Sequence, residues 1–123
     1  HRLPVEVIRK TVVACKKQKL RTIVCAQSLS KIKKVASFKP DYIAYEPSSL
    51  IGSDKSVTSA KPNVIVKAVD LVKASKTKLL VGAGVHSSED VGQALLLGVS
   101  GVLIGHALPK AKDPKKFLKE LLI

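Results

Sequence analysis

The feature that most constrains the fold of this chain is the regular alternation of two hydrophobic patterns along it. Short runs of mostly apolar or aromatic residues end at Cys25, Glu46, Gly82 and Gly105. Before and between these runs, apolar residues recur at three- and four-residue steps, which is the spacing of an amphipathic helix. The sequence therefore predicts an α/β fold in which helices connect four parallel strands.

The residues at the ends of these runs indicate where each element begins and stops. We expect helices over residues 4–19, 28–37, 62–75 and 87–98 and after Asp113, and strands over residues 20–26, 41–46, 78–82 and 101–105. Ser28 and Asp113 are typical N-caps, and Ser87 with Asp90 resembles a capping box. Gly98 can end a helix in the left-handed conformation.

The connection that follows Glu46 is longer than the others, so functional residues are expected there. Four parallel strands can form an open doubly wound sheet or half of an eight-stranded barrel, and the periodicity favours neither. In both architectures the chemistry lies at the C-terminal ends of the strands. The loops must therefore decide between the two folds.

Length and composition limit the classes of protein that this chain can belong to. Its 123 residues, 46% of them hydrophobic, suit one domain over residues 1–123. The apolar runs are too short to span a bilayer and no signal peptide is evident, so we expect a soluble, cytoplasmic protein. Cys15 and Cys25 offer neither a disulfide framework nor a metal-binding spacing, and we expect reduced, mostly buried thiols and no cofactor or metal.

The formal net charge of +13 raises the question of a nucleic-acid partner. The basic residues are nearly all Lys, spread singly or in pairs along helical segments, without an Arg-rich stripe or interleaved aromatic residues. This distribution favours solvated helix faces over a nucleic-acid footprint. An acidic partner segment is a second explanation.

Glu46 is the residue in this pattern that most suggests chemistry. It ends a strand of apolar and aromatic residues, and Pro47 fixes the direction of the chain as it leaves the sheet. A carboxylate at this position is either a solvated strand-end residue or a catalytic base, whose pKa desolvation would raise into a useful range.

In the order AYEPSSLIGS (residues 44–53), VGAGV (81–85) and GVLIGHA (101–107), three motifs resemble the archaeal-type triosephosphate isomerase family over nearly the whole chain. Residues 44–53, AYEPSSLIGS, resemble the base and the substrate-closing lid of that family, and residues 56–62 resemble the exit of the archaeal lid into the next helix. Residues 81–85, VGAGV, and 101–107, GVLIGHA, followed by 110–114, resemble its seventh and eighth barrel strands and their exits. The resemblance implies the C-terminal half of a (β/α)8 barrel, with strands five to eight.

The resemblance also implies roles for individual residues. Glu46 would be the base that moves a proton between the carbons of dihydroxyacetone phosphate and glyceraldehyde 3-phosphate, a step of glycolysis and gluconeogenesis. Backbone groups of five residues would hold the substrate phosphate: Ile51, Gly52, Gly84, Gly105 and His106. Glycines suit this role because they let backbone N–H groups approach an anion closely.

Two positions depart from the family pattern, and some of the family's site is expected elsewhere. Asp54 stands in place of the lid's second Gly, and His106 in place of a small residue. The family also needs an Asn and a Lys from the first strand and a His from the fourth, which we expect to precede this chain. His1 is interpreted as a non-catalytic residue at a helix entry, and Cys25 matches a strand-end Cys of the family.

The chain alone is therefore expected to be nearly inactive and to pair with an N-terminal half-barrel or with a copy of itself, because a half-barrel has unpaired sheet edges. Two other functions stay open. One is a half-barrel that binds phosphates or sugar phosphates without turnover, which would tolerate loss of Glu46. The other is a basic nucleic-acid-binding domain, whose binding would depend steeply on salt.

Overall fold

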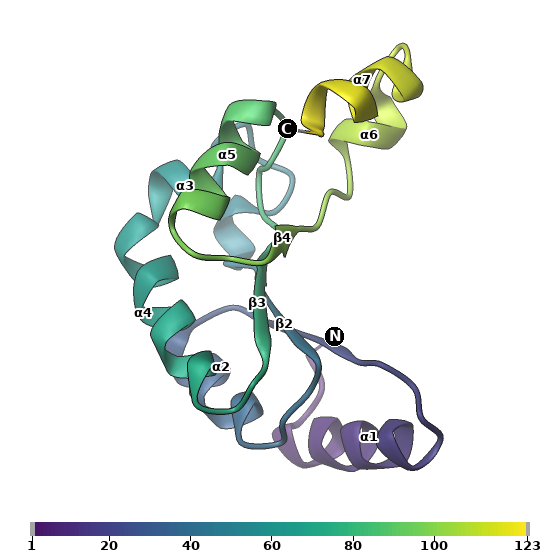
Figure 1. Ribbon diagram of the computed structural model, residues 1–123, viewed down its shortest axis with the longest axis vertical. Coiled ribbons are helices and arrows are strands. Elements are labelled where there is room, and N and C mark those ends of the chain that lie inside the picture. The colour runs from purple at the N-terminus through teal and green to yellow at the C-terminus, as the bar shows by residue number, and fades with distance from the viewer. Residues whose placement is uncertain (1, 123) are drawn as a thin grey trace.

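The computed structural model describes residues 2–122, so His1 lies outside the described residues. The elements alternate as the sequence predicts (Figure 1). In chain order they are α1 (Val5–Lys17), β1 (Ile23–Ala26), α2 (Leu29–Ala36), β2 (Tyr42–Tyr45), the 3-10 turn η1 (Ser48–Leu50), α3 (Val57–Ala60), α4 (Pro62–Lys73), β3 (Lys78–Val81), α5 (Ser88–Leu96), β4 (Gly101–Val102), α6 (Ala107–Lys110) and α7 (Pro114–Leu121).

The four strands form one parallel sheet in the order β1-β2-β3-β4. Ile23 is in register with Tyr42, and Tyr42 with Lys78, so the strand beginnings lie together at one end. Figure 1 shows α2, α3, α4 and α5 on one side of the curved sheet, while α1 and the α6–α7 pair flank the other side at its two ends. The expected α/β fold with four parallel strands and flanking helices is confirmed.

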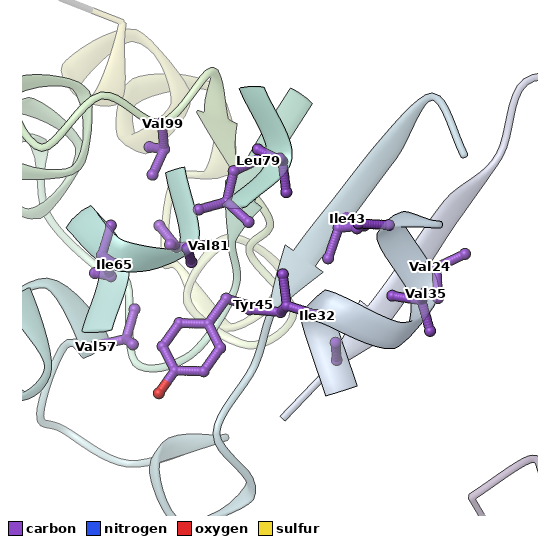
Figure 2. Close-up of a cluster of buried hydrophobic side chains, with 14 of the residues drawn as sticks. Val24, Ile32, Val35, Ile43, Tyr45, Val57, Ile65, Leu79, Val81 and Val99 are labelled. Atoms are coloured by element: carbon purple, nitrogen blue, oxygen red, sulfur yellow. The ribbon is translucent and has the colours of Figure 1, made fainter. Parts of the chain in front are cut away.

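The core lies between the sheet and the helices that cover it (Figure 2). Alternate strand residues point into it because side chains on a strand alternate between faces. Its fully buried members include Ile43 of β2, Val81 of β3, Ile32 and Val35 of α2, and Ile65 of α4. Burying each such side chain contributes about 1.5–3 kcal/mol, so this layer fixes the position of the strand ends.

The opposite face of the sheet is covered unevenly. Ala44 and Leu80, in the two central strands, are buried, whereas 52% of the surface of Ile23 in β1 is exposed. Cys25 lies on the same face of β1 and is also exposed, and Cys15 is half-buried. The expectation of mostly buried thiols is therefore wrong for Cys25, because β1 is an edge strand whose inward side chains face an open groove.

The helix ends follow the local signals in the sequence. Ser28 and Asp113 accept backbone hydrogen bonds as N-caps, and Ser87 with Asp90 forms a complete capping box. Gly98 has φ +96°, the predicted left-handed conformation. These devices depend only on neighbouring residues, which is why the sequence reveals them.

The strands and some helix faces differ from the prediction. All four strands are shorter than expected, with four residues each in β1, β2 and β3 and two in β4, because a strand ends where its hydrogen bonds to a neighbouring strand end. Three leucines that have the three- and four-residue spacing of a buried helix face are exposed: Leu95 by 47%, Leu118 by 46% and Leu122 by 73%. The buried residues are Asp90 and Ala94 in α5 and Leu121 in α7.

No helix within residues 2–122 is long and apolar enough to cross a membrane.

Candidate active site

Glu46 follows directly on the last residue of β2 and is held between the two neighbouring strands. Its backbone N–H donates to Ala26 O at 2.9 Å, and the N–H of Gly82 donates to Tyr45 O at 3.2 Å. Tyr45 is buried on the helix side of the sheet, so the side chain of Glu46, one residue further, points to the opposite face. The sheet therefore presents the carboxylate at the C-terminal ends of the strands.

The carboxylate of Glu46 lies against residues of both neighbouring strands. A Cβ added to Gly82 would fall 2.5 Å from Oε1 of Glu46, so the carboxylate occupies the space that a side chain there would need. On the other side, partial burial and the hydrogen bond to Glu46 raise the pKa of the Cys25 thiol to about 11. A thiol with this pKa stays protonated near neutral pH and adds no second negative charge beside the carboxylate.

An open groove of about 710 Å³ runs between α1 and the inner face of β1. Glu46, Cys25 and Ile51 line it together with apolar residues of α1 and with Arg2 and Arg21. The groove is large enough for a small organic molecule. The structure thus brings Glu46 and Ile51, two residues predicted for the site, to one cavity.

The loop after Glu46, residues 47–56, is the predicted lid. It contains regular structure, because the 3-10 turn η1 lies near its start and α3 follows directly after it. Arg2 donates to Ser48 Oγ at 3.3 Å, and the N–H of Val57 donates to Ala83 O at 2.9 Å. The lid is therefore attached to the N-terminal segment near its start and to the turn after β3 at its end.

Gly84 is where the lid and the turn after β3 make their closest contact. Its φ of +67° favours glycine, and a Cβ there would fall 2.0 Å from the carbonyl oxygen of Lys55. His86 stabilises the same turn, because its Nδ1–H donates to Gly84 O at 2.6 Å. The same ring nitrogen lies 3.5 Å from Oδ2 of Asp90.

The other predicted phosphate-binding residues lie on the lid and on the loop after β4. A Cβ on Gly52, which has φ +71°, would lie 3.5 Å from Cε1 of His106, so these two residues are neighbours. Ile51 is 51% exposed, and a Cβ on Gly105 would meet nothing within 4 Å. Gly52 and His106 therefore bring the lid and the loop after β4 side by side, and Gly105 has open space beside it.

The two departures from the family pattern lie on the same surface. Asp54 and His106 are both exposed. Because His106 contacts Gly52 of the lid, its side chain occupies the region where the resemblance places the substrate phosphate. Asp54 adds a negative charge to the same loop, two residues from Gly52.

Sequence reasoning missed some contacts of the site, namely those between segments far apart in the chain. Gly82 and Lys55 were not among the predicted site residues, although Gly82 makes room for Glu46 and Lys55 packs on Gly84. The Gly-Ala-Gly turn was the available signal for Gly82. Within residues 2–122, no group of three or more His, Cys, Asp or Glu side chains is placed to hold a metal ion.

Residues 3–121 match the family model described as triosephosphate isomerase. The chain is 41% identical over 117 residues to the triosephosphate isomerase of Methanocaldococcus jannaschii, covering 94% of this chain and 53% of that protein. It is 38% identical over 99 residues to that of Thermoplasma volcanium, covering 80% of this chain and 46% of that protein. The chain thus spans about half the length of the curated relatives it matches.

Solved structures support the same architecture. A mutant tryptophan synthase α-subunit from Pyrococcus furiosus superposes with a TM-score of 0.75 at 22% identity, over 98% of this chain and 52% of that one. This likeness shows the fold alone, a partial TIM barrel, as the sequence resemblance implied. With the family model matched over nearly all residues and relatives near 40% identity, the chain belongs to the triosephosphate isomerase family.

Proposed function

We propose that this chain carries the catalytic base and the lid of a triosephosphate isomerase that interconverts dihydroxyacetone phosphate and glyceraldehyde 3-phosphate. One observation carries the proposal: Glu46 ends a central strand, faces a groove, and leads directly into a loop that contacts the turns after β3 and β4. Chemistry on parallel-strand barrels lies at this end of the strands.

In this proposal Glu46 removes a proton from one substrate carbon and returns it to the next. Backbone groups of the lid and of the turns after β3 and β4 hold the phosphate: Ile51, Gly52, Gly84, Gly105 and His106. Two observations support the role of Glu46 as the base. The neighbouring thiol of Cys25 is protonated, and the lack of a side chain at Gly82 leaves space for the carboxylate. No cofactor is needed for proton transfer of this kind.

We further propose that residues 1–123 form a single domain equivalent to barrel strands five to eight. The electrophilic His and the Lys of the family would then come from a segment equivalent to strands one to four, or be lacking in a self-associated form. Turnover should therefore depend on that complementary segment. The cytoplasm remains the predicted location for a glycolytic enzyme of this type.

The test is isomerase turnover of glyceraldehyde 3-phosphate by this chain, alone and mixed with the N-terminal half of an archaeal relative. We expect turnover in the mixture, and a loss of about 10²–10⁴-fold in kcat when Glu46→Gln removes the base. Asp70→Asn, which removes an exposed carboxylate of α4, is the matched control and should retain turnover.

Two results would contradict the proposal. Turnover that persists in the Glu46→Gln variant would show that Glu46 is not the base. Absence of turnover in every mixture, with a triose phosphate still bound by calorimetry, would replace the isomerase with a sugar-phosphate-binding half-barrel.

A further inference from the structure

The positive charge of the chain is concentrated at one end of the folded sheet. We call residues 16–22, 33–41 and 73–78 the basic edge, because they lead from the ends of α1, α2 and α4 into β1, β2 and β3. The basic edge holds ten of the 22 Lys and Arg residues and one of the nine acidic residues, Asp41. Parallel strands begin on the same side, so these segments meet at the end opposite Glu46, toward the bottom of Figure 1.

Hydrogen bonds join the three segments into one continuous surface. The N–H of Thr22 donates to Asp41 Oδ2 at 2.7 Å, which links the first segment to the second. Thr77 Oγ1 donates to Pro40 O at 2.8 Å, and the N–H of Lys78 donates to Asp41 O at 3.0 Å, which link the second to the third. The positive side chains therefore project from a fixed scaffold, and the one carboxylate among them is engaged with backbone.

Lysines occupy the left-handed positions that follow the three helices of the basic edge. Lys19, Lys39 and Lys76 have φ values of 57°, 53° and 58°, whereas the corresponding residue after α5 is Gly98. Glycine is the residue that this left-handed position favours, since a Cβ is disfavoured there. The last turns of α1, α2 and α4 already contain lysines, so Lys19, Lys39 and Lys76 add further positive charge at the same helix ends.

The charges of the basic edge are available to an external anion. All ten basic side chains are exposed. Across residues 2–122, one of them forms an ion pair, Lys73 with Asp70 at 2.9 Å. Arg21 stacks on the ring of Tyr42, with its guanidinium carbon 5.1 Å from the ring centroid, which holds that charge at the surface.

We propose that the basic edge binds the phosphate backbone of a nucleic acid without reading its sequence. Neighbouring strands lie about 4.8 Å apart, so the three segments present closely spaced positive charges to a ligand of high negative charge density. Lys is depleted at interfaces between proteins, which depend on aromatic, Arg and apolar anchors. Leu20 is the one large apolar side chain that is exposed within the basic edge. This surface therefore also has too few apolar side chains to insert into a bilayer. Basic residues that are scattered along the sequence are thus gathered by the fold.

The test is a fluorescence titration of the full chain against labelled DNA and RNA duplexes of about 20 base pairs, at about 50–200 mM KCl. We expect the logarithm of the affinity to fall linearly with the logarithm of salt, with a slope on the order of −5. The comparison of the two duplexes identifies which nucleic acid is preferred, and binding to either supports the proposal.

The variant that tests the surface is the triple substitution Lys19→Gly, Lys39→Gly and Lys76→Gly. Glycine suits the left-handed positions, so the midpoint of thermal unfolding should stay equal or rise. We expect the affinity at about 100 mM salt to fall about tenfold or more, and the salt slope to lose about 3 units. Arg21→Gln with Lys78→Gln removes two further charges without touching a helix end and should weaken binding as well.

The matched control removes three exposed lysines near or on α7: Lys112→Gln, Lys115→Gln and Lys119→Gln. It lowers the net charge by the same amount and should change the affinity by less than about twofold, since these residues lie outside the basic edge. A loss as large as that of the glycine variant would overturn the proposal, because net charge alone would then explain binding. Failure to bind either duplex at the lowest salt, or equal binding to polyglutamate or to phosphatidylserine vesicles, would overturn it too.

Discussion

Two glycines leave room for the groups that surround the candidate site. At Gly82 an added Cβ would meet the carboxylate of Glu46, which is the end of a flexible side chain and can move. At Gly84 it would meet the backbone carbonyl of Lys55 at 2.0 Å, and backbone moves only if the whole lid moves. The second glycine is therefore the less replaceable of the two, and its role is to let the lid rest on the turn after β3.

We expect Gly84→Ala to lower the free energy of unfolding by about 2 kcal/mol or more. The added Cβ would clash with the lid, and alanine is unfavourable at the positive φ of this position. Urea denaturation measures this loss. Gly105→Ala is the matched control, since a Cβ there meets nothing within 4 Å. It should change the free energy of unfolding by less than about 0.5 kcal/mol, and equal effects of the two variants would contradict the contact with Lys55.

The thiol of Cys25 reports on Glu46 directly. Its pKa of about 11 means that the reactive thiolate is scarce near neutral pH, so alkylation should be slow at pH 7 and accelerate up to pH 10. Glu46→Gln removes the negative charge, lowers the pKa of Cys25 and should speed alkylation severalfold at pH 8.

The measurement is the rate of iodoacetamide labelling in a Cys15→Ser background, where Cys25 is the remaining thiol. Asp70→Asn serves as the charge control, because Asp70 lies on α4 and pairs with Lys73. An alkylation rate that is unchanged by Glu46→Gln would show that the carboxylate does not contact the thiol.

Among the elements, the sequence predicts what is local and misses what depends on contacts between distant segments. The helix caps and the left-handed Gly98 follow from neighbouring residues alone. The lengths of β1 and β4 do not, because hydrogen bonds to a partner strand determine where a strand ends. Leu95 has the correct spacing for a buried residue and is exposed, since nothing within the described chain covers that side of α5.

The same distinction applies to the candidate site. Glu46 could be found from the sequence because a strand end followed by Pro47 defines it locally. The contact of Gly52 with His106 joins loops more than fifty residues apart in the chain, and no local pattern encodes it. Only the family resemblance grouped these residues in advance, and it assigned no role to Lys55 or Gly82.

The capping box of α5 allows the contribution of one helix end to be measured. Ser87→Ala removes the hydroxyl that accepts the N–H of Asp90 at 3.1 Å and should lower the free energy of unfolding by about 1 kcal/mol. Ser88→Ala, one residue later and exposed, is the control and should stay within about 0.5 kcal/mol of the parent chain. Denaturation midpoints with equal shifts for both variants would contradict a capping role for Ser87.

For the molecule as a whole, the uneven charge has a thermodynamic consequence. Like charges gathered at one end repel one another, and salt screens that repulsion over a Debye length of about 10 Å at 0.1 M. The repulsion acts in the folded chain, where the basic edge brings together residues that are separated in the unfolded chain.

We therefore expect the thermal unfolding midpoint to rise with NaCl, by about 4 °C for each kcal/mol of repulsion that is screened. Calorimetry between about 20 and 500 mM salt measures the rise, and the rise should be smaller in the variant with glycine at positions 19, 39 and 76. A midpoint that falls with salt would mean that favourable ion pairs outweigh the repulsion.

The basic edge and Glu46 lie at opposite ends of the same four strands. A chain held on a large anion by its basic edge would have a fixed orientation, with the open ends of its strands turned away from the support. The groove at Glu46 reaches Arg21 at its far end, so a bound anion and a small molecule in the groove would share that one side chain. Under the proposed function, the parallel direction of the strands would separate the site of attachment from the reacting carboxylate by the length of a strand.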